Sequence, residues 1–327
     1  LQADKGSNEV AILPYTVSAG GAYAVESHSG TIEMQAPEGN NKITILPHQK
    51  EAKAAYDGIG KDLPDKAKYS GIYSHGEQAK IALSGENNLI ITDVDALDMG
   101  DNAIGNGISA ADLGNVTLNA KDSNVIQATT QAVYSQNGTI LIKGSENQIH
   151  GEQNALYAIS TDPQKGSQIS VSGQALITSG GDNPVIVSNG RDFSEYPTTI
   201  HVEYDGHSAL QGTIRALGLG EVSVLPMKQQ GHLIFDGNID AHHGTDENET
   251  RGGTVNLSLS ANSVWTGWSD TGLVEGVKEN LPLTQEIPSW GHVGLQMTSG
   301  SQWNIAKQSS VSTVSGNGGT LYFKGNG

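Results

Sequence analysis

Residues 132–150 read AVYSQNGTILIKGSENQIH, and this stretch decides the fold. It holds short apolar segments that are separated by polar turns containing glycine and asparagine. The first segment, AVYS, has relatives at three other places, GAYA at 21–24, GIYS at 71–74 and ALYA at 155–158. The turn GSEN has relatives too, GENN at 85–88 and DSN at 122–124. Each unit therefore reads as strand, turn, strand, turn, strand.

An apolar-x-apolar strand recurs along the whole chain, and successive copies begin 22 to 49 residues apart. Strands this short bury their apolar side by stacking on the same strand of the next unit. Self-similarity at this period predicts an all-β fold, a parallel β-helix or solenoid of about ten coils with loop insertions. A Greek-key sandwich also uses many short strands, but it predicts hairpins about 8–12 residues apart. The predicted copies begin at Ile32, Ile81, Val116, Ile140, Ile169, Ile200, Val222, Val255, Val293 and Leu321.

Five stretches interrupt this period, and loops on a rigid solenoid often carry binding specificity. We expect a rod over residues 1–260 with insertions at 47–69, 190–198, 226–231 and 241–253. A fifth insertion, 269–291, falls within an expected C-terminal cap region, 261–327. Each loop is either a binding element or a tolerated surface insertion. The first is locally basic, because it contains Lys50, Lys53, Lys61, Lys66 and Lys68.

Composition argues against several classes of partner. The net charge is −17 and the arginines are Arg191, Arg215 and Arg251, whereas nucleic acid requires clustered basic side chains. Attraction to anionic lipid is disfavoured for the same reason. The chain has no cysteine, so disulfides and thiolate metal sites are impossible. No run approaches the roughly 18 apolar residues of a membrane-spanning helix.

The last quarter of the chain carries the most specific signal. NSVWTG at 262–267, GSQW at 300–303 and GGTLYF at 318–323 resemble the C-terminal end of pertactin-like autotransporter passengers. The upstream repeats look like those of autotransporter adhesins. The resemblance implies a right-handed β-helix on a bacterial cell surface, exported through the outer membrane by a C-terminal β-barrel. Membrane attachment is expected only through such a barrel, which these 327 residues do not include.

All four tryptophans fall in this quarter. We expect them to supply buried aromatic area where the stack of coils would otherwise fray. They are Trp265, Trp268, Trp290 and Trp303.

The sequence offers no recognisable catalytic arrangement. It lacks a Gly-x-Ser-x-Gly elbow, a His-Glu-x-x-His pair and the Gly-Asp-Ser-Gly of the family's serine proteases, so we expect no enzymatic activity. The densest acidic cluster is either a weak calcium site or a solvated turn, and no other cofactor is expected. That cluster comprises Asp93, Asp95, Asp98 and Asp101. A second set suits a transition metal by residue type, or forms a polar loop: His242, His243, Asp246, Glu247 and Glu249.

The repeated AVYS-like segments each contain a tyrosine, and we expect these tyrosines to stack as a ladder along one face. They are Tyr23, Tyr73, Tyr134 and Tyr157, and the equivalent slot near Gly107 holds Ser109. Because Ile72, Val133 and Leu156 alternate with them, one of the two sets must face the core, and the aliphatic set is the better candidate. An outward ladder would be an amphipathic platform for carbohydrate or protein, whereas an inward one is only core.

The leading functional hypothesis is a non-enzymatic adhesin associated with virulence. It would bind host glycans or extracellular-matrix proteins, or self-associate between cells in aggregates and biofilm. A β-helix enzyme that degrades polysaccharide is the second hypothesis, and a structural spacer is the third. Close carboxylates with a basic residue in one groove favour the enzyme, an aromatic face without them favours adhesion, and a featureless face favours the spacer.

Overall fold

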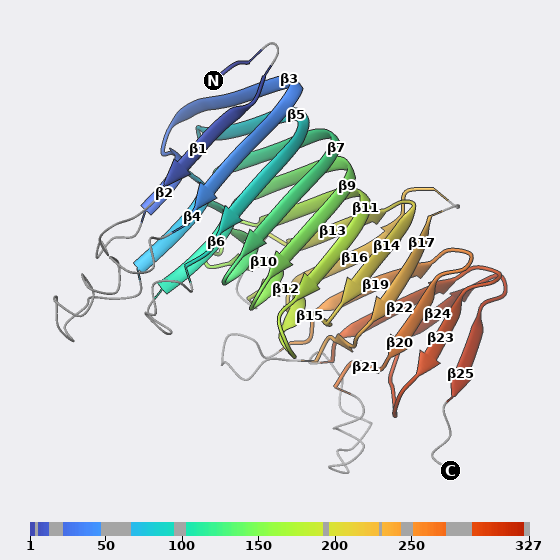
Figure 1. Ribbon diagram of the computed structural model, residues 1–327. Helices are drawn as coiled ribbons and strands as arrows, with labels where there is room; N and C mark the ends of the chain where they lie inside the picture. The colour runs from blue at the N-terminus through green and yellow to red at the C-terminus, as the bar shows by residue number, and fades with distance from the viewer. Residues whose placement is uncertain are drawn as a thin grey trace.

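The computed structural model describes residues 1–3, 6–12, 22–46, 67–94, 103–191, 196–228, 231–242, 251–272 and 290–323. Every regular element within these ranges is a β-strand. The strands lie side by side as the rungs of one elongated rod, with the two ends of the chain at its opposite ends (Figure 1). No helix in these ranges is long and apolar enough to cross a membrane. The chain is a parallel β-helix, as the repeat predicts.

The first face of the rod carries the repeated apolar-x-apolar strands. From Ile32 to Val293 the predicted positions pair in one continuous parallel register, so nine of the ten predicted copies are confirmed. The first halves of five long strands lie here, β3 (Gly30–Ile45), β5 (Ala79–Thr92), β7 (Asn115–Ala128), β9 (Thr139–Gly151) and β11 (Ser167–Ser179). They are followed by β13 (Thr198–Tyr204), β16 (Gly220–Pro226), β19 (Thr254–Leu259), β22 (His292–Met297) and β24 (Thr313–Gly316).

The second face holds the other halves of the long strands, and here one prediction is wrong. Leu321 pairs with Trp303 on this face, whereas Val314 continues the first-face column after Leu295. The second face also carries apolar-x-apolar strands, such as Leu233–Phe235 and Trp303–Ile305, so spacing alone does not assign a copy to its face. The remaining strands of this face are β1 (Asn8–Ile12), β14 (His207–Gln211), β17 (His232–Asp236), β20 (Val264–Gly267), β23 (Gln302–Ile305) and β25 (Thr320–Phe323).

The third face is a separate sheet in which the AVYS-like segments pair with one another. Its strand order follows the chain, so each strand lies on the next coil's equivalent. The strands are β2 (Ala22–Ser27), β4 (Ala67–His75), β6 (Ala103–Ala111), β8 (Gln131–Gln136), β10 (Asn154–Ser160), β12 (Pro184–Gly190), β15 (Thr213–Gly218), β18 (Ile239–Asp240) and β21 (Ser269–Asp270).

Most residues of the predicted insertions lie outside the described ranges. Several residues at the ends of the insertions belong to strands. Residues 67–69 of the first insertion begin β4. Gly190 ends β12 and Thr198 begins β13, while Pro226 ends β16. The first two residues of the 269–291 insertion form β21.

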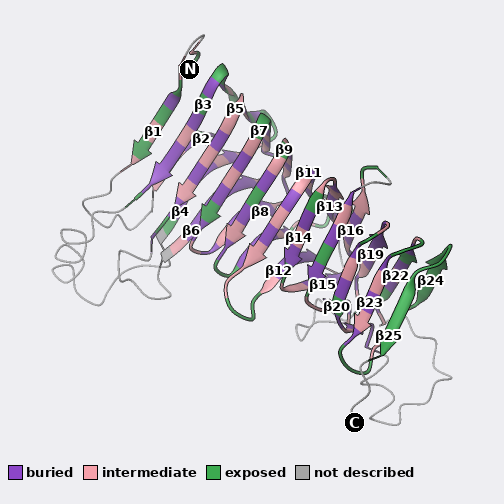
Figure 2. Cartoon of the chain, turned by 45° about the vertical axis from the view of Figure 1, so that its right-hand side comes forward, coloured by how far each residue is buried: buried purple, intermediate pink, exposed green. Residues whose placement is uncertain are grey.

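The core is a set of columns that run along the rod axis. Buried and less buried residues alternate along many of the strands (Figure 2), and the buried apolar ones are mostly Ile, Val and Leu. Towards the C-terminal end the second-face column becomes aromatic: Phe235 stacks on Trp265 at 5.7 Å and Trp265 on Trp303 at 4.3 Å between ring centroids. These two tryptophans are buried as expected, but Trp268 and Trp290 are only half-buried.

Asparagine side chains fill the inside of the bend between the first and second faces. The predicted GENN and GSEN turns are therefore not chain reversals but bends within single long strands. Each amide donates to the next along the axis at 2.8–3.0 Å, and most also donate to a backbone carbonyl of the next coil. Because buried amides are costly unless they are paired, this ladder is what allows polar residues to lie inside. Its members are Asn8, Asn41, Asn88, Asn124 and Asn147.

Replacing Asn124 by alanine should lower the free energy of unfolding by about 2–4 kcal/mol, because Asn88 and Asn147 each lose a buried hydrogen-bond partner. Equilibrium denaturation followed by circular dichroism measures the change. Asn119→Ala is the matched control, because Asn119 is exposed on the same strand and its loss should cost less than about 0.5 kcal/mol. Equal losses in the two variants would contradict a structural role for the ladder.

Candidate functional site

The third face brings three of the four predicted tyrosines into one row. Tyr73 pairs with Ser109, Ser109 with Tyr134, and Tyr134 with Tyr157. The alternating Ile72, Val133 and Leu156 are completely buried, so they face the core, as expected. The tyrosines are half-buried and line the outer side of the sheet. We call the positions Glu26, Tyr73, Ser109, Tyr134 and Tyr157 the aromatic row.

Tyr23 lies elsewhere than predicted, because Glu26 occupies its expected place opposite Tyr73. Tyr23 pairs with Ser70 instead, three residues earlier along the strand. Its ring nevertheless stacks on that of Tyr73, with the centroids 4.6 Å apart. The register is marked instead by the serine that follows Glu26 and the serine that follows Tyr134. These two residues, Ser27 and Ser135, donate to the carbonyls of Gly30 and Gly138.

A second row runs beside the aromatic row, three residues earlier on each strand. Tyr23 pairs with Ser70, Ser70 with Asn106, and Gln131 with Asn154, while the Asn106 side-chain oxygen accepts the Gln131 N–H. We call this set the amide row. Our sequence analysis did not identify its polar members, although their fixed offset of three from the tyrosine positions could have revealed them.

All residues of the two rows except Glu26 line a groove of about 500 Å³, which we call the tyrosine groove. Within it, Tyr134 and Tyr157 stack at 5.8 Å between ring centroids, and the Tyr134 hydroxyl donates to Gln136 Oε1 at 2.9 Å. The Tyr73 hydroxyl lies 3.3 Å from His75 Nδ1. Burial raises the pKa of Tyr134 to about 12, so this hydroxyl keeps its proton at physiological pH.

The floor of the groove is polar. The Ser109 hydroxyl lies 3.1 Å from that of Ser70 and 3.2 Å from Asn106 Nδ2. Tyr69 also lines the groove and is 1% exposed, and its hydroxyl has no hydrogen-bond partner within the described part of the chain. Among the described lining residues Lys68 is the one with a permanent charge, and none is a carboxylate. The groove is therefore close to neutral in an acidic protein.

The predicted calcium cluster is mostly outside the described residues. Asp93 is exposed after β5, whereas Asp95, Asp98 and Asp101 lie beyond the described ranges. In the described ranges no group of three His, Asp or Glu side chains could hold a metal ion. Of the second metal-binding set, only His242 lies in a described range.

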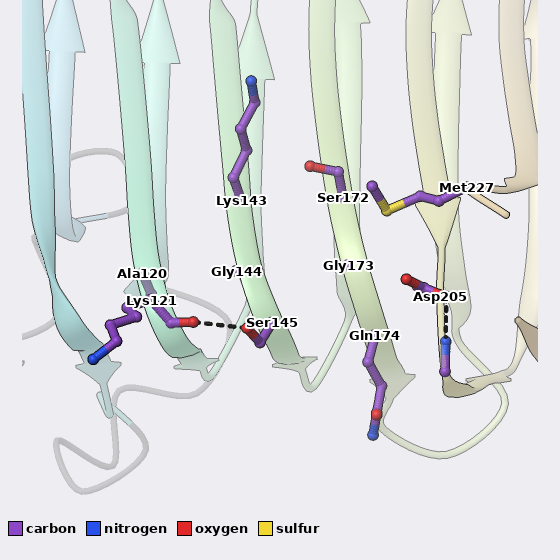
Figure 3. Close-up of a pocket in the computed structure, with 11 residues that line it drawn as sticks. Ala120, Lys121, Lys143, Gly144, Ser145, Ser172, Gly173, Gln174, Asp205 and Met227 are labelled. Atoms are coloured by element: carbon purple, nitrogen blue, oxygen red, sulfur yellow. Dashed lines mark hydrogen bonds between the residues drawn. The ribbon is translucent and has the colours of Figure 1, made fainter.

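A second hollow of about 490 Å³ lies on the other side of the rod, at the bend between the first and second faces. Lys121 and Lys143 are among its lining residues, and the Lys121 ammonium turns away from it towards Glu86. The Ser145 hydroxyl donates to the Lys121 carbonyl (Figure 3). Asp205 is the single carboxylate among its described lining residues. Glycosidic-bond cleavage by the common mechanism needs two carboxylates, and the described lining of this hollow supplies one of them.

Beyond Tyr157 the aromatic row continues as a charged row, with Val187, Arg215, Asp240 and Asp270 paired in turn. Asp240 is buried, and its carboxylate accepts from Arg215 Nε at 2.9 Å and makes a short hydrogen bond to His242 Nδ1. Burial alone would raise the pKa of Asp240, but the hydrogen bond and charge of His242, together with Arg215, outweigh it and lower that pKa. The same hydrogen bond raises the pKa of His242 against the effect of burial.

No protein-family model matches the chain, and neither a curated protein nor a solved structure matches it. Function has to be inferred from the grooves and side-chain clusters of the chain itself.

The opposite pKa shifts of His242 and Asp240 predict a pH window for the stability that their pair contributes. The contribution of His242 is complete below its ordinary pKa of 6.5 and is lost as pH rises through the raised value. The contribution of Asp240 is complete above its ordinary pKa of 3.8 and is lost as pH falls through the lowered value. The pair therefore stabilises most between about pH 4 and pH 6.5.

His242→Ala should consequently lower the unfolding temperature more at about pH 5.5 than at about pH 9, as measured by scanning fluorimetry. In an Asp240→Asn background the difference between the two pH values should shrink, because the main charge partner is gone and only the weaker effect of Asp270 remains. Equal losses at the two pH values in the parent protein would refute a charge interaction between these side chains.

Proposed function

We propose that this protein is a non-enzymatic adhesin of the bacterial cell surface, the passenger of an autotransporter, and that it binds glycans through the tyrosine groove. The observation that carries the proposal is the groove itself, in which stacked tyrosine rings face a row of amide and hydroxyl side chains. A sugar ring has apolar C–H faces and a polar hydroxyl edge, and this combination of surfaces complements both features.

The surface location rests on the resemblance of the C-terminal motifs to autotransporter passengers. The two tryptophans of those motifs, Trp265 and Trp303, stack with their planes 1° apart inside the last coils. A stack of that kind supports a cap role for this region, because it adds a large buried apolar area close to the end of the rod.

An adhesin is favoured over a polysaccharide-degrading enzyme by the placement of the acidic groups. Neither hollow offers two carboxylates among its described lining residues. Within the described ranges one carboxylate with a basic neighbour is buried, that of Asp240. It is hydrogen-bonded to Arg215 and His242 and has a lowered pKa, which is unsuited to a general acid. The enzyme hypothesis would have to rest on that cluster. A spacer is disfavoured, because it has no need of an aromatic groove.

Purified protein applied to a glycan and matrix-protein array should bind saturably to glycans. Tyr134→Ala and Tyr157→Ala should each weaken that binding at least about tenfold, because each removes one ring of a stacked pair. Tyr196→Ala is the matched control, since Tyr196 is 51% exposed and lies outside the groove, and it should bind like the parent.

The array should be run with and without calcium. A change in binding would test independently whether Asp93, Asp95, Asp98 and Asp101 form a calcium site. Binding to matrix proteins alone would replace the glycan ligand by a protein. If the protein binds nothing on the array but self-associates in sedimentation, its function would be adhesion between cells. Silence with a monomeric protein would overturn the adhesin proposal.

A further inference from the structure

The aromatic row has one missing ring, at Ser109. Tyr73 and Tyr134 stand on either side of it, two strands apart, which corresponds to about 9.6 Å at the usual strand spacing. Each of these tyrosines is backed by a second ring on the side away from the gap. Tyr23 stacks on Tyr73 and Tyr157 stacks on Tyr134. The gap thus has two aromatic walls, and each wall is supported from behind.

The dimensions of the gap suit one inserted ring. A ring placed midway would lie about 4.8 Å from each tyrosine, which falls within the range of favourable stacking distances. Serine is the smallest side chain of the row, and it lines the same groove as Tyr73 and Tyr134. Ser109 itself is 4% exposed and lies at the floor of the groove.

The polar side chains at the floor of the groove indicate which kind of ligand ring the gap binds. Ser109, Ser70 and Asn106 form a polar cluster there. The edge of a phenyl ring offers only C–H groups to such a floor, and a tyrosine or tryptophan ring offers a single polar group. The edge of a pyranose offers several hydroxyls. The floor therefore favours a sugar over an aromatic side chain of a protein.

The charges of the groove and of the whole chain indicate whether the bound sugar is neutral or acidic. Lys68, at the groove, is the single permanently charged side chain among its described lining residues, and the chain carries a net charge of −17. Long-range repulsion from such a charge disfavours acidic glycans. We propose that the gap at Ser109 is a monosaccharide subsite, in which one neutral pyranose ring lies between Tyr73 and Tyr134 with its hydroxyls towards Ser109 and Asn106. This assignment rests on the glycan-binding function proposed above.

The test is to fill the gap with the side chain that the row already uses. Saturation-transfer NMR on the whole chain, with methyl glycosides of glucose, galactose, mannose and N-acetylglucosamine, reports which ring protons touch the protein. The same measurement is made with any oligosaccharide that binds on the array. The parent should transfer saturation to a pyranose ring, and Tyr196→Ala, which lies outside the groove, should do the same. Ser109→Tyr should reduce binding at least tenfold.

Ser109→Tyr should fold, because a tyrosine there continues the stack from Tyr73 to Tyr134, and its unfolding temperature should equal or exceed that of the parent. Ser109→Leu is the second variant that fills the gap, and it should reduce binding in the same way. Tyr73→Ala removes one wall and should also weaken binding at least tenfold.

The possible outcomes distinguish failure of the proposed subsite from failure of the proposed glycan-binding function. Undiminished binding in Ser109→Tyr and Ser109→Leu, with loss in Tyr134→Ala, would overturn the subsite and leave the tyrosine groove as the glycan site. Transfer to N-acetyltyrosine amide in place of the sugars would assign the gap to an aromatic side chain and also overturn it. Absence of transfer to every glycoside and oligosaccharide from the parent would overturn the glycan-binding function itself.

Discussion

Each strand of this rod pairs with the equivalent strands of the coils before and after it, and the rest of the structure depends on this constraint. Ile140, for example, lies between Val116 and Ile169, and the same register runs from Ile32 to Val293. A residue type repeated at one position of the unit therefore becomes a column. Aliphatic columns make the core, the asparagine column fills the bend, and the tyrosines become a row on the outer surface. The surface chemistry follows from alignment between coils rather than from any local motif.

This dependence explains how much of the fold could be predicted from the sequence. The first-face column was predictable, because a β-branched or aliphatic residue at every coil leaves a repeat that spacing alone reveals. Leu321 was assigned to the wrong face, because its Leu-Tyr-Phe pattern satisfies either apolar column. Tyr23 was misplaced by three residues, because a four-letter match around a tyrosine fixes the residue type but not its register. The asparagine ladder was missed for a different reason: GENN looks like an exposed turn until the strands on both sides are known to be continuous.

The candidate site was predictable only in part. The tyrosines and their outward orientation followed from the alternation with Ile72, Val133 and Leu156. The amide row did not follow, since Asn106, Gln131 and Asn154 are ordinary polar residues until pairing of the strands places them side by side. Pairing of the strands also determines which charged side chains lie next to the groove. The same outward row that is aromatic at Tyr157 becomes charged at Arg215 and Asp240, so the neutral groove occupies one stretch of an acidic rod.

A groove built in this way is rigid before any ligand arrives. Its walls stand on paired strands, each ring is held by a neighbouring ring, and the Tyr134 hydroxyl is already bonded to Gln136. Binding to a surface of this kind requires little ordering of side chains, so a larger share of the contact energy remains as affinity. A loop with the same residues would have to be ordered on binding, at a cost in entropy for every side chain. For weak ligands such as single sugar rings, this difference favours a preformed face of the β-helix as the place for recognition.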